Sequence, residues 1–232
     1  MNYHKHAVHI LANYSDQGNH LLFEAQRMIY AGAFFPEFKE APAWRKSGID
    51  ILNREVNVQV YNDGGQFELD PHYHLAAINI FCKALGIADV NGFRNEFPQE
   101  YLDTIEKMIM FYANISFPDY TNPCFSDAKI TEKKEMLKNY REWSKLFPKN
   151  ETIKYLATDG KEGALPDYMS KGFLKSGFFV FRNSWGMDAT QMVVKAGPKG
   201  FWHCQPDNGT FEMWFNGKNL FPDSGSYVYA GE

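Results

Sequence analysis

In the first two thirds of the chain, apolar residues recur at helical spacing. After Gly18 they fall three or four positions apart, which predicts an amphipathic helix that ends near Gly32. Asn19 stands at the start of this stripe, where a side-chain cap is expected. The same spacing predicts three further helices, and the first of these begins with Asp70 as cap and Pro71 in the first turn: 70–86, 98–112 and 131–147.

Residues 47–60 fit two patterns. From Ile49 to Val56 the apolar residues have helical spacing. Val56, Val58 and Val60 alternate instead, as in a strand. The sequence leaves both structures open here, and it predicts a turn immediately afterwards at 62–65.

Beyond Gly172 the pattern changes to the alternation of strands. Asn216-Gly217 is typical of a tight hairpin turn, so the strands are expected to pair antiparallel. Helices followed by antiparallel strands predict a multidomain α+β protein with a domain boundary in the loop 158–171. So small a sheet would leave exposed edges, so we expect further strands after residue 232. The expected strands are 177–182, 190–196, 210–215 and 219–221.

Composition narrows the class of protein. Hydrophobic residues make up 44% and charged residues 22%, as in ordinary globular proteins. No run reaches the ~18 apolar residues of a membrane span, and no signal-peptide pattern opens the chain, so membrane insertion is not expected. The net charge of -4 argues against binding nucleic acid by bulk charge, and an acidic polymer would need a local basic groove. The three cysteines form no CxxC motif and are interpreted as small buried residues.

Three polar clusters are candidates for chemistry, and each has a simpler structural interpretation. Asn19-His20 would otherwise be a helix cap beside a surface histidine. Tyr73 lies between His72 and His74, which would lower the pKa of its phenol if they were charged, or it is a core residue. The stretch 201–209 lies between two strands and is otherwise an ordinary polar turn.

Within 201–209, His203, Gln205 and Asp207 alternate, so they are expected to face one side. No nucleophile elbow, phosphate-binding loop or zinc-protease motif occurs in the chain.

Taken together, these clusters resemble the heparinase II/III-like polysaccharide lyases. The order and spacing of the matching stretches agree over nearly the whole chain: 18–25, 63–74, 203–212 and 222–227. The resemblance implies a partial (α/α) toroid over residues 1–160, followed by the start of an antiparallel β-sandwich over residues 161–232. It also implies a periplasmic or secreted enzyme that cleaves heparan sulfate, an acidic polysaccharide, by β-elimination at the uronic acid.

The same resemblance assigns roles at the uronate. Asn19 matches the residue that neutralises the uronate carboxylate, which stabilises the enolate-like intermediate, and His20 assists it. Tyr73 matches the phenol that protonates the departing O4 and removes the C5 proton on its own face. His203 matches the base that acts from the opposite face. His20 and His74 are the expected substrate contacts.

The chemistry implied here requires no metal or organic cofactor. Some members of the superfamily hold a structural divalent ion in the β-domain, and the corresponding positions here are Gln205 and Asp223. Because relatives carry a carboxylate where this chain has Gln205, such a site should be weaker. A third ligand would lie beyond Glu232.

The sequence leaves three alternatives open. The same lyase chemistry can act on alginate or chondroitin, because groove residues decide the substrate. A non-catalytic carbohydrate-binding fragment would not need the Asn, Tyr and His positions. A glycoside hydrolase would require two facing carboxylates, and its product would lack a conjugated double bond.

Overall fold

The computed structural model describes residues 2–226. They form two compact units, and helices α4 and α5 contribute residues to both of them. The first unit comprises Met1–Val60 and Ala76–Ile105, and the second comprises Tyr61–Leu75 and Glu106–Glu232.

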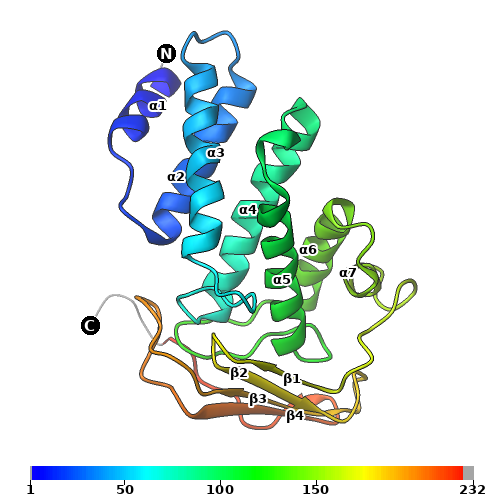
Figure 1. Cartoon of the computed structure of the whole chain (residues 1–232). Coiled ribbons are helices and arrows are strands. Elements are labelled where there is room, and N and C mark those ends of the chain that lie inside the picture. Colours follow the sequence, from blue (N-terminus) through cyan, green and yellow to red (C-terminus); the bar gives the residue numbers. More distant parts are fainter. Residues whose placement is uncertain (1, 227–232) are drawn as a thin grey trace. The chain divides into compact units, whose positions relative to one another are not determined.

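The first unit is helical. In it α2 and α3 lie side by side (Figure 1). Gly48 permits this approach, because an added Cβ atom would lie 2.3 Å from the main-chain oxygen of Ala25. The core contains fully buried side chains from both helices, among them Leu22 and Trp44. The elements that lie in this unit or enter it are α1 (Asn2–Ala12), α2 (Gly18–Phe34), α3 (Ala41–Val58), α4 (Pro71–Asn91), η1 (Arg94–Glu96) and α5 (Gln99–Ile115).

Helix α3 resolves the ambiguous stretch at 47–60. Ile49, Leu52 and Val56 are buried, whereas Val58 is 59% exposed. Burial thus follows the helical spacing, and the valine alternation carries no strand. The helices predicted at 18–32, 70–86, 98–112 and 131–147 are confirmed, with ends shifted by a few residues. The sequence did not predict α1, α7 or β1.

The second unit contains helices and an antiparallel sheet. The five strands follow one another in the sheet in chain order, β1-β2-β3-β4-β5 (Figure 1). Its elements, apart from the ends of α4 and α5, are α6 (Lys133–Leu146), α7 (Glu151–Ala157), β1 (Ser170–Phe173), β2 (Phe178–Arg182), β3 (Thr190–Lys195), β4 (Thr210–Phe215) and β5 (Lys218–Asn219). The chain is therefore helical first and forms an antiparallel sheet afterwards, as predicted.

The predicted hairpin turn is confirmed. Asn216 and Gly217 both have positive φ, 43° and 86°, as a two-residue type I′ hairpin turn requires. The turn sets the register of β4 and β5, in which Phe215 pairs with Lys218. This short connection places β5 beside β4 at the edge of the sheet.

Among the described residues, α4 is the one helix long and apolar enough to cross a membrane. Its most apolar stretch is 56% buried within the protein. The core helix of a globular protein has the same length and composition, so this feature alone does not indicate a membrane span.

Candidate active site

Helix α4 begins at a side-chain cap that fixes the position of Tyr73. Asp70 Oδ1 accepts hydrogen bonds from the main-chain N–H groups of His72 (2.7 Å) and Tyr73 (3.0 Å), which confirms the predicted cap. Burial raises the pKa of the Asp70 carboxyl to about 7, and these two N–H groups oppose the rise. Tyr73 therefore lies in the first turn, half-buried, with its backbone position set by Asp70.

His74 is a structural residue in this arrangement. Its Nδ1 accepts from the main-chain N–H of Gln66 (3.1 Å), and its Nε2 donates to the main-chain oxygen of Met108 (2.9 Å). Its side chain is buried, and burial lowers its pKa to about 4. Both ring nitrogens are bonded to protein partners, so neither nitrogen is free to bind substrate in this arrangement.

The two imidazoles that flank Tyr73 are neutral at neutral pH. Burial, followed by the nearby charge of Lys129, lowers the pKa of His72 below its usual range. His74 is neutral by burial alone. The condition for the sequence-based suggestion, a cation on each side of the phenol, is therefore not met.

His203 stacks directly on Tyr73. The ring centroids lie 3.5 Å apart and the planes differ by 12°. The family resemblance implies one site for both residues although 129 residues separate them in the chain, and the structure brings them together. The main-chain oxygen of His203 also accepts from the N–H of Asp127 (3.3 Å), which holds the loop that carries the imidazole.

Glu68 is a site residue to which sequence reasoning assigned no role. Its carboxylate is fully buried and forms a short hydrogen bond with Nδ1 of His203. The glutamate belongs to the stretch 63–74 that carries the family resemblance. Nothing in its spacing indicates a partner in the distant loop, because only the fold brings the two together.

A buried lysine holds the His203 loop against the rest of the second unit. Lys195 Nζ lies 2.6 Å from Asp207 Oδ1, 2.5 Å from Ser126 Oγ and 3.3 Å from Cys204 Sγ. Asp207 Oδ2 in turn accepts from the main-chain N–H of Ser126 (2.6 Å). Because Lys195 is 2% exposed, this ion pair is shielded from solvent.

The side chains of His203, Gln205 and Asp207 do not converge on one shared group. Their side chains bind three different partners: Glu68, Asp127 and Lys195 respectively. The stretch is a loop without strand pairing, so the alternation of a strand does not apply to it.

Asn19 and His20 lie in the first turn of α2, in the first unit. The cap position belongs to Gln17, which makes no side-chain cap bond, so the prediction of Asn19 as cap is wrong by two residues. Gly18 is buried with φ of 76°, and its main-chain oxygen accepts from Gln59 Nε2 (3.3 Å). Asn19 is half-buried and His20 is exposed.

The two implied metal positions are already engaged by protein groups. Gln205 Nε2 donates to Asp127 Oδ1 (2.8 Å), and Asp223 Oδ1 accepts from the N–H of Gly225 (2.8 Å). Within residues 2–226 no group of three or more His, Cys, Asp or Glu side chains is arranged to hold a metal ion. The implied ion does not fit these residues as they stand, and the third implied position lies outside the described residues.

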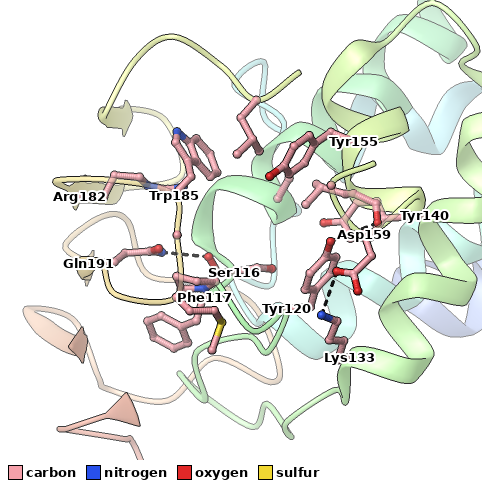
Figure 2. A pocket seen from close by; sticks show the side chains of 17 residues that line it. Ser116, Phe117, Tyr120, Lys133, Tyr140, Tyr155, Asp159, Arg182, Trp185 and Gln191 are labelled. Carbon is pink, nitrogen blue, oxygen red and sulfur yellow. Dashed lines mark hydrogen bonds and ion pairs between the residues drawn. The ribbon is translucent and has the colours of Figure 1, made fainter. Parts of the chain in front are cut away.

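A separate cavity of about 190 Å³ lies in the second unit. Figure 2 shows Trp185 on the side of the strands and Tyr155 on the side of the helices. The guanidinium of Arg182 lies 3.4 Å from the centroid of the Trp185 ring, and Lys133 pairs with Asp159 at 2.9 Å. None of the residues predicted for the site lines this cavity.

Two family models match the chain. The model for the Heparinase II/III N-terminus matches residues 1–155, and the model described as Heparinase II/III-like, C-terminal matches residues 166–232.

Similar proteins carry related names. A heparin-sulfate lyase of Bacteroides stercoris is 90% identical over 232 residues, which are 100% of this chain and 35% of that protein. A heparin-sulfate lyase of Pedobacter heparinus is 51% identical over 230 residues, covering 99% of this chain and 35% of the relative. The chain thus spans about a third of the length of these relatives.

Solved structures agree with this similarity. A crystal structure of heparan sulfate lyase from Pedobacter heparinus has a TM-score of 0.88 at 51% identity, covering 99% of this chain and 36% of that one. A crystal structure of heparinase III has a TM-score of 0.86 at 31% identity, covering 94% of this chain and 37% of that one.

Proposed function

Because the chain belongs to the heparinase II/III family, we propose that the whole protein is a polysaccharide lyase that cleaves heparan sulfate by β-elimination at the uronic acid. The resemblance found in the sequence motifs is confirmed by the family match. The relatives named heparin-sulfate lyase support the choice of polymer.

The observation that carries the chemistry is the stacked pair of Tyr73 and His203. A phenol and an imidazole in ring contact supply two proton-transfer groups at one place. Both are held on well-anchored backbone, Tyr73 by the Asp70 cap and His203 by its loop. Such a pair is what abstraction of one proton and delivery of another require.

The proposed reaction begins at C5 of the uronate. A base removes the C5 proton, the carboxylate accepts the resulting electron density, and the C4–O4 bond then breaks to leave a C4–C5 double bond. Neutralising the carboxylate stabilises the intermediate, and this is the role proposed for the amide of Asn19, with His20 beside it. Tyr73 donates its phenolic proton to the departing O4.

The stacked geometry constrains where the sugar binds. At 3.5 Å the two rings are in van der Waals contact, so a pyranose does not fit between them. Action from opposite faces therefore requires the pair to part when substrate arrives. Rotation of Tyr73 about its side-chain torsion parts the rings and leaves the bond between His203 and Glu68 in place.

We extend the proposal to the finer architecture, a partial (α/α) toroid followed by the start of a β-sandwich. The support for the sandwich is the alternation of burial in the sheet. In β2 Val180 is buried while Phe181 is 48% exposed, and in β4 Phe211 and Phe215 are 46% and 48% exposed. A row of large apolar side chains on one face of a sheet is what a second sheet of a sandwich covers.

The proposed elimination uses only side-chain proton transfer and carboxylate neutralisation, so it requires neither a metal ion nor an organic cofactor. The partner is the anionic polysaccharide itself. A long polyanion does not cross a lipid bilayer unaided, which supports a periplasmic or secreted location for the enzyme.

Product absorbance tests this proposal directly. The full-length enzyme is incubated with heparan sulfate, heparin, chondroitin sulfate and alginate, and the ultraviolet absorbance of the conjugated double bond is followed. Fastest release of unsaturated product from heparan sulfate is expected. Faster turnover of chondroitin sulfate or alginate would change the substrate but keep the chemistry, and chain cleavage without absorbance would replace the lyase with a hydrolase.

A further inference from the structure

We propose that Glu68 is a positioning residue that sets the tautomer of His203 and so makes its Nε2 the proton acceptor. This inference rests on the proposed function and identifies a residue to which the family resemblance assigned no role. Glu68 acts through the imidazole and has no direct contact with substrate in the proposal.

The orientation of Glu68 is fixed by a chain of hydrogen bonds that begins at its own backbone. The main-chain N–H of Glu68 donates to Gln66 Oε1 (3.0 Å). An N–H only donates, so this bond determines which end of the Gln66 amide faces it. The other end, Nε2, then donates to Glu68 Oε1 (3.3 Å). Only the second carboxylate oxygen, Oε2, is directed to His203.

This arrangement determines the protonation of the imidazole. A carboxylate oxygen accepts hydrogen bonds, so the neutral His203 ring must carry its proton on Nδ1, toward Glu68. Nε2 is then left with a lone pair, which a base requires. After proton abstraction, the doubly protonated ring carries a positive charge beside the Glu68 carboxylate, which stabilises it.

The surroundings favour this role over simple anchoring of the loop. The loop is already held by the ion pair of Lys195 with Asp207 and by the main-chain bond from Asp127 to His203. A glutamine at position 68 would fill the same volume and also bond to the imidazole. A buried carboxylate, 0% exposed, costs more to desolvate than an amide, so an anchoring role alone does not account for it.

The test is the variant Glu68→Gln in the full-length enzyme. Gln66 Nε2 still requires an acceptor, so the new amide directs its oxygen to Gln66 and its NH2 group to His203. The imidazole must then accept at Nδ1 and hold its proton on Nε2. We expect kcat to fall by at least about 10²-fold on substrates that need His203, with KM changed less than about threefold.

The tautomer itself is read from ¹⁵N chemical shifts of labelled histidine, with His203 assigned by its loss in His203→Gln. The wild-type ring is expected to be protonated at Nδ1, and the Glu68→Gln ring at Nε2. A wild-type ring protonated at Nε2 would overturn the proposal even if Glu68→Gln did not fold. An unchanged tautomer in a folded Glu68→Gln enzyme would overturn it as well.

Glu106→Gln is the matched control. It makes the same chemical change at a half-buried carboxylate of the second unit, whose partner is Asn150 Nδ2 (2.8 Å). Its kcat and the His203 tautomer should both remain as in wild type, and a loss equal to that of Glu68→Gln would contradict the proposal. If the wild-type enzyme releases no unsaturated product from any polymer, the proposed lyase function is wrong. A change of the His203 tautomer in Glu68→Gln would still show in that case that Glu68 orients His203.

Discussion

Helices α4 and α2 each begin with residues of the proposed site, but their first turns are held in different ways. At α4, Asp70 caps the helix with two hydrogen bonds and His74 is bonded through both ring nitrogens. At α2, Gln17 supplies no cap bond, and the chain enters the helix through Gly18 with positive φ. Side-chain hydrogen bonds therefore define the start of α4, and backbone conformation defines the start of α2.

The difference matches the demands of the two proposed roles. Tyr73 must deliver a proton to one oxygen, and transfer depends steeply on distance and alignment. Asn19 must neutralise a carboxylate, which tolerates more variation because an amide can donate to either oxygen. We infer that polar side-chain bonding is concentrated at the start of α4 because the chemistry there requires tighter placement.

The largest expected effect is that of Tyr73→Phe. The Asp70 cap bonds to main-chain N–H groups, so removing the phenolic oxygen leaves the start of α4 intact. Turnover should fall by at least ~10²–10⁴-fold while substrate affinity stays nearly unchanged, because the proton is used only as the C4–O4 bond breaks. The measurement is kcat together with equilibrium binding of a heparan sulfate oligosaccharide. Activity retained on every substrate would remove Tyr73 from the mechanism.

His203→Ala should have a smaller, selective effect. If glucuronate and iduronate present their C5 protons on opposite faces, Tyr73 alone serves one epimer and His203 is needed for the other. We expect a loss of about 10²-fold or more on one epimer and a much smaller loss on the other. The assay uses defined oligosaccharides of each epimer. Equal losses on both would show that His203 has no face-specific role.

The sequence predicted those parts of the structure that depend on neighbouring residues. The Asp70 cap and the Asn216-Gly217 turn involve residues a few positions apart, so their chemistry is visible in the sequence. The bond between Glu68 and His203 spans 135 positions and exists only in the folded chain. Spacing cannot indicate such a partner, and the same is true of Lys195 with Asp207.

The wrong prediction for Asn19 has a local cause. Asn19 was expected as a cap from its residue type, but the positive φ of Gly18 shifts the helix start toward Gln17. The family resemblance implied that His74 contacts substrate, but both of its ring nitrogens are bonded within the protein. Adjacent residues on a helix point about 100° apart, so one can face the site while the other enters the core.

Asp70, which caps α4, changes its protonation with pH, so it predicts a dependence of stability on pH. The start of α2 has no such group at its cap position, which is Gln17. The folded-state pKa of Asp70 is raised from 3.8 to about 7, so between these values the unfolded chain has lost the proton and the folded chain retains it. Stability attributable to Asp70 therefore decreases as pH rises from about 4 to about 7 and is constant above. Glu212, raised to about 7, acts in the same direction, whereas His74, lowered to about 4, adds stability as pH rises to about 6.5.

Asp70→Asn keeps the cap oxygen but removes the titration. Between pH 4 and pH 8 the unfolding free energy should decrease less in this variant than in wild type. The difference between the two decreases should be on the order of 2 kcal/mol. Urea unfolding across this range measures the two slopes. Gln17→Ala is the corresponding change at α2 and should leave the wild-type slope unaltered, because Gln17 neither titrates nor caps. Parallel slopes for wild type and Asp70→Asn would contradict the raised pKa.

The smallest expected effect tests the backbone that starts α2. Gly18 has φ of 76°, a conformation that L residues adopt at a cost, so Gly18→Ala should destabilise the protein by about 1 kcal/mol. The same substitution at Gly86, within α4 of the first unit and with no atom within 4 Å of an added Cβ, should stabilise it by about 0.5–1 kcal/mol. Opposite signs for two glycine-to-alanine changes in one unit would isolate the backbone effect, and thermal unfolding of both variants measures it.

Because Asn19 directly follows Gly18, turnover should also fall modestly in Gly18→Ala but not in Gly86→Ala. A Gly18→Ala enzyme with wild-type stability and turnover would show that the left-handed residue is not what sets the position of Asn19.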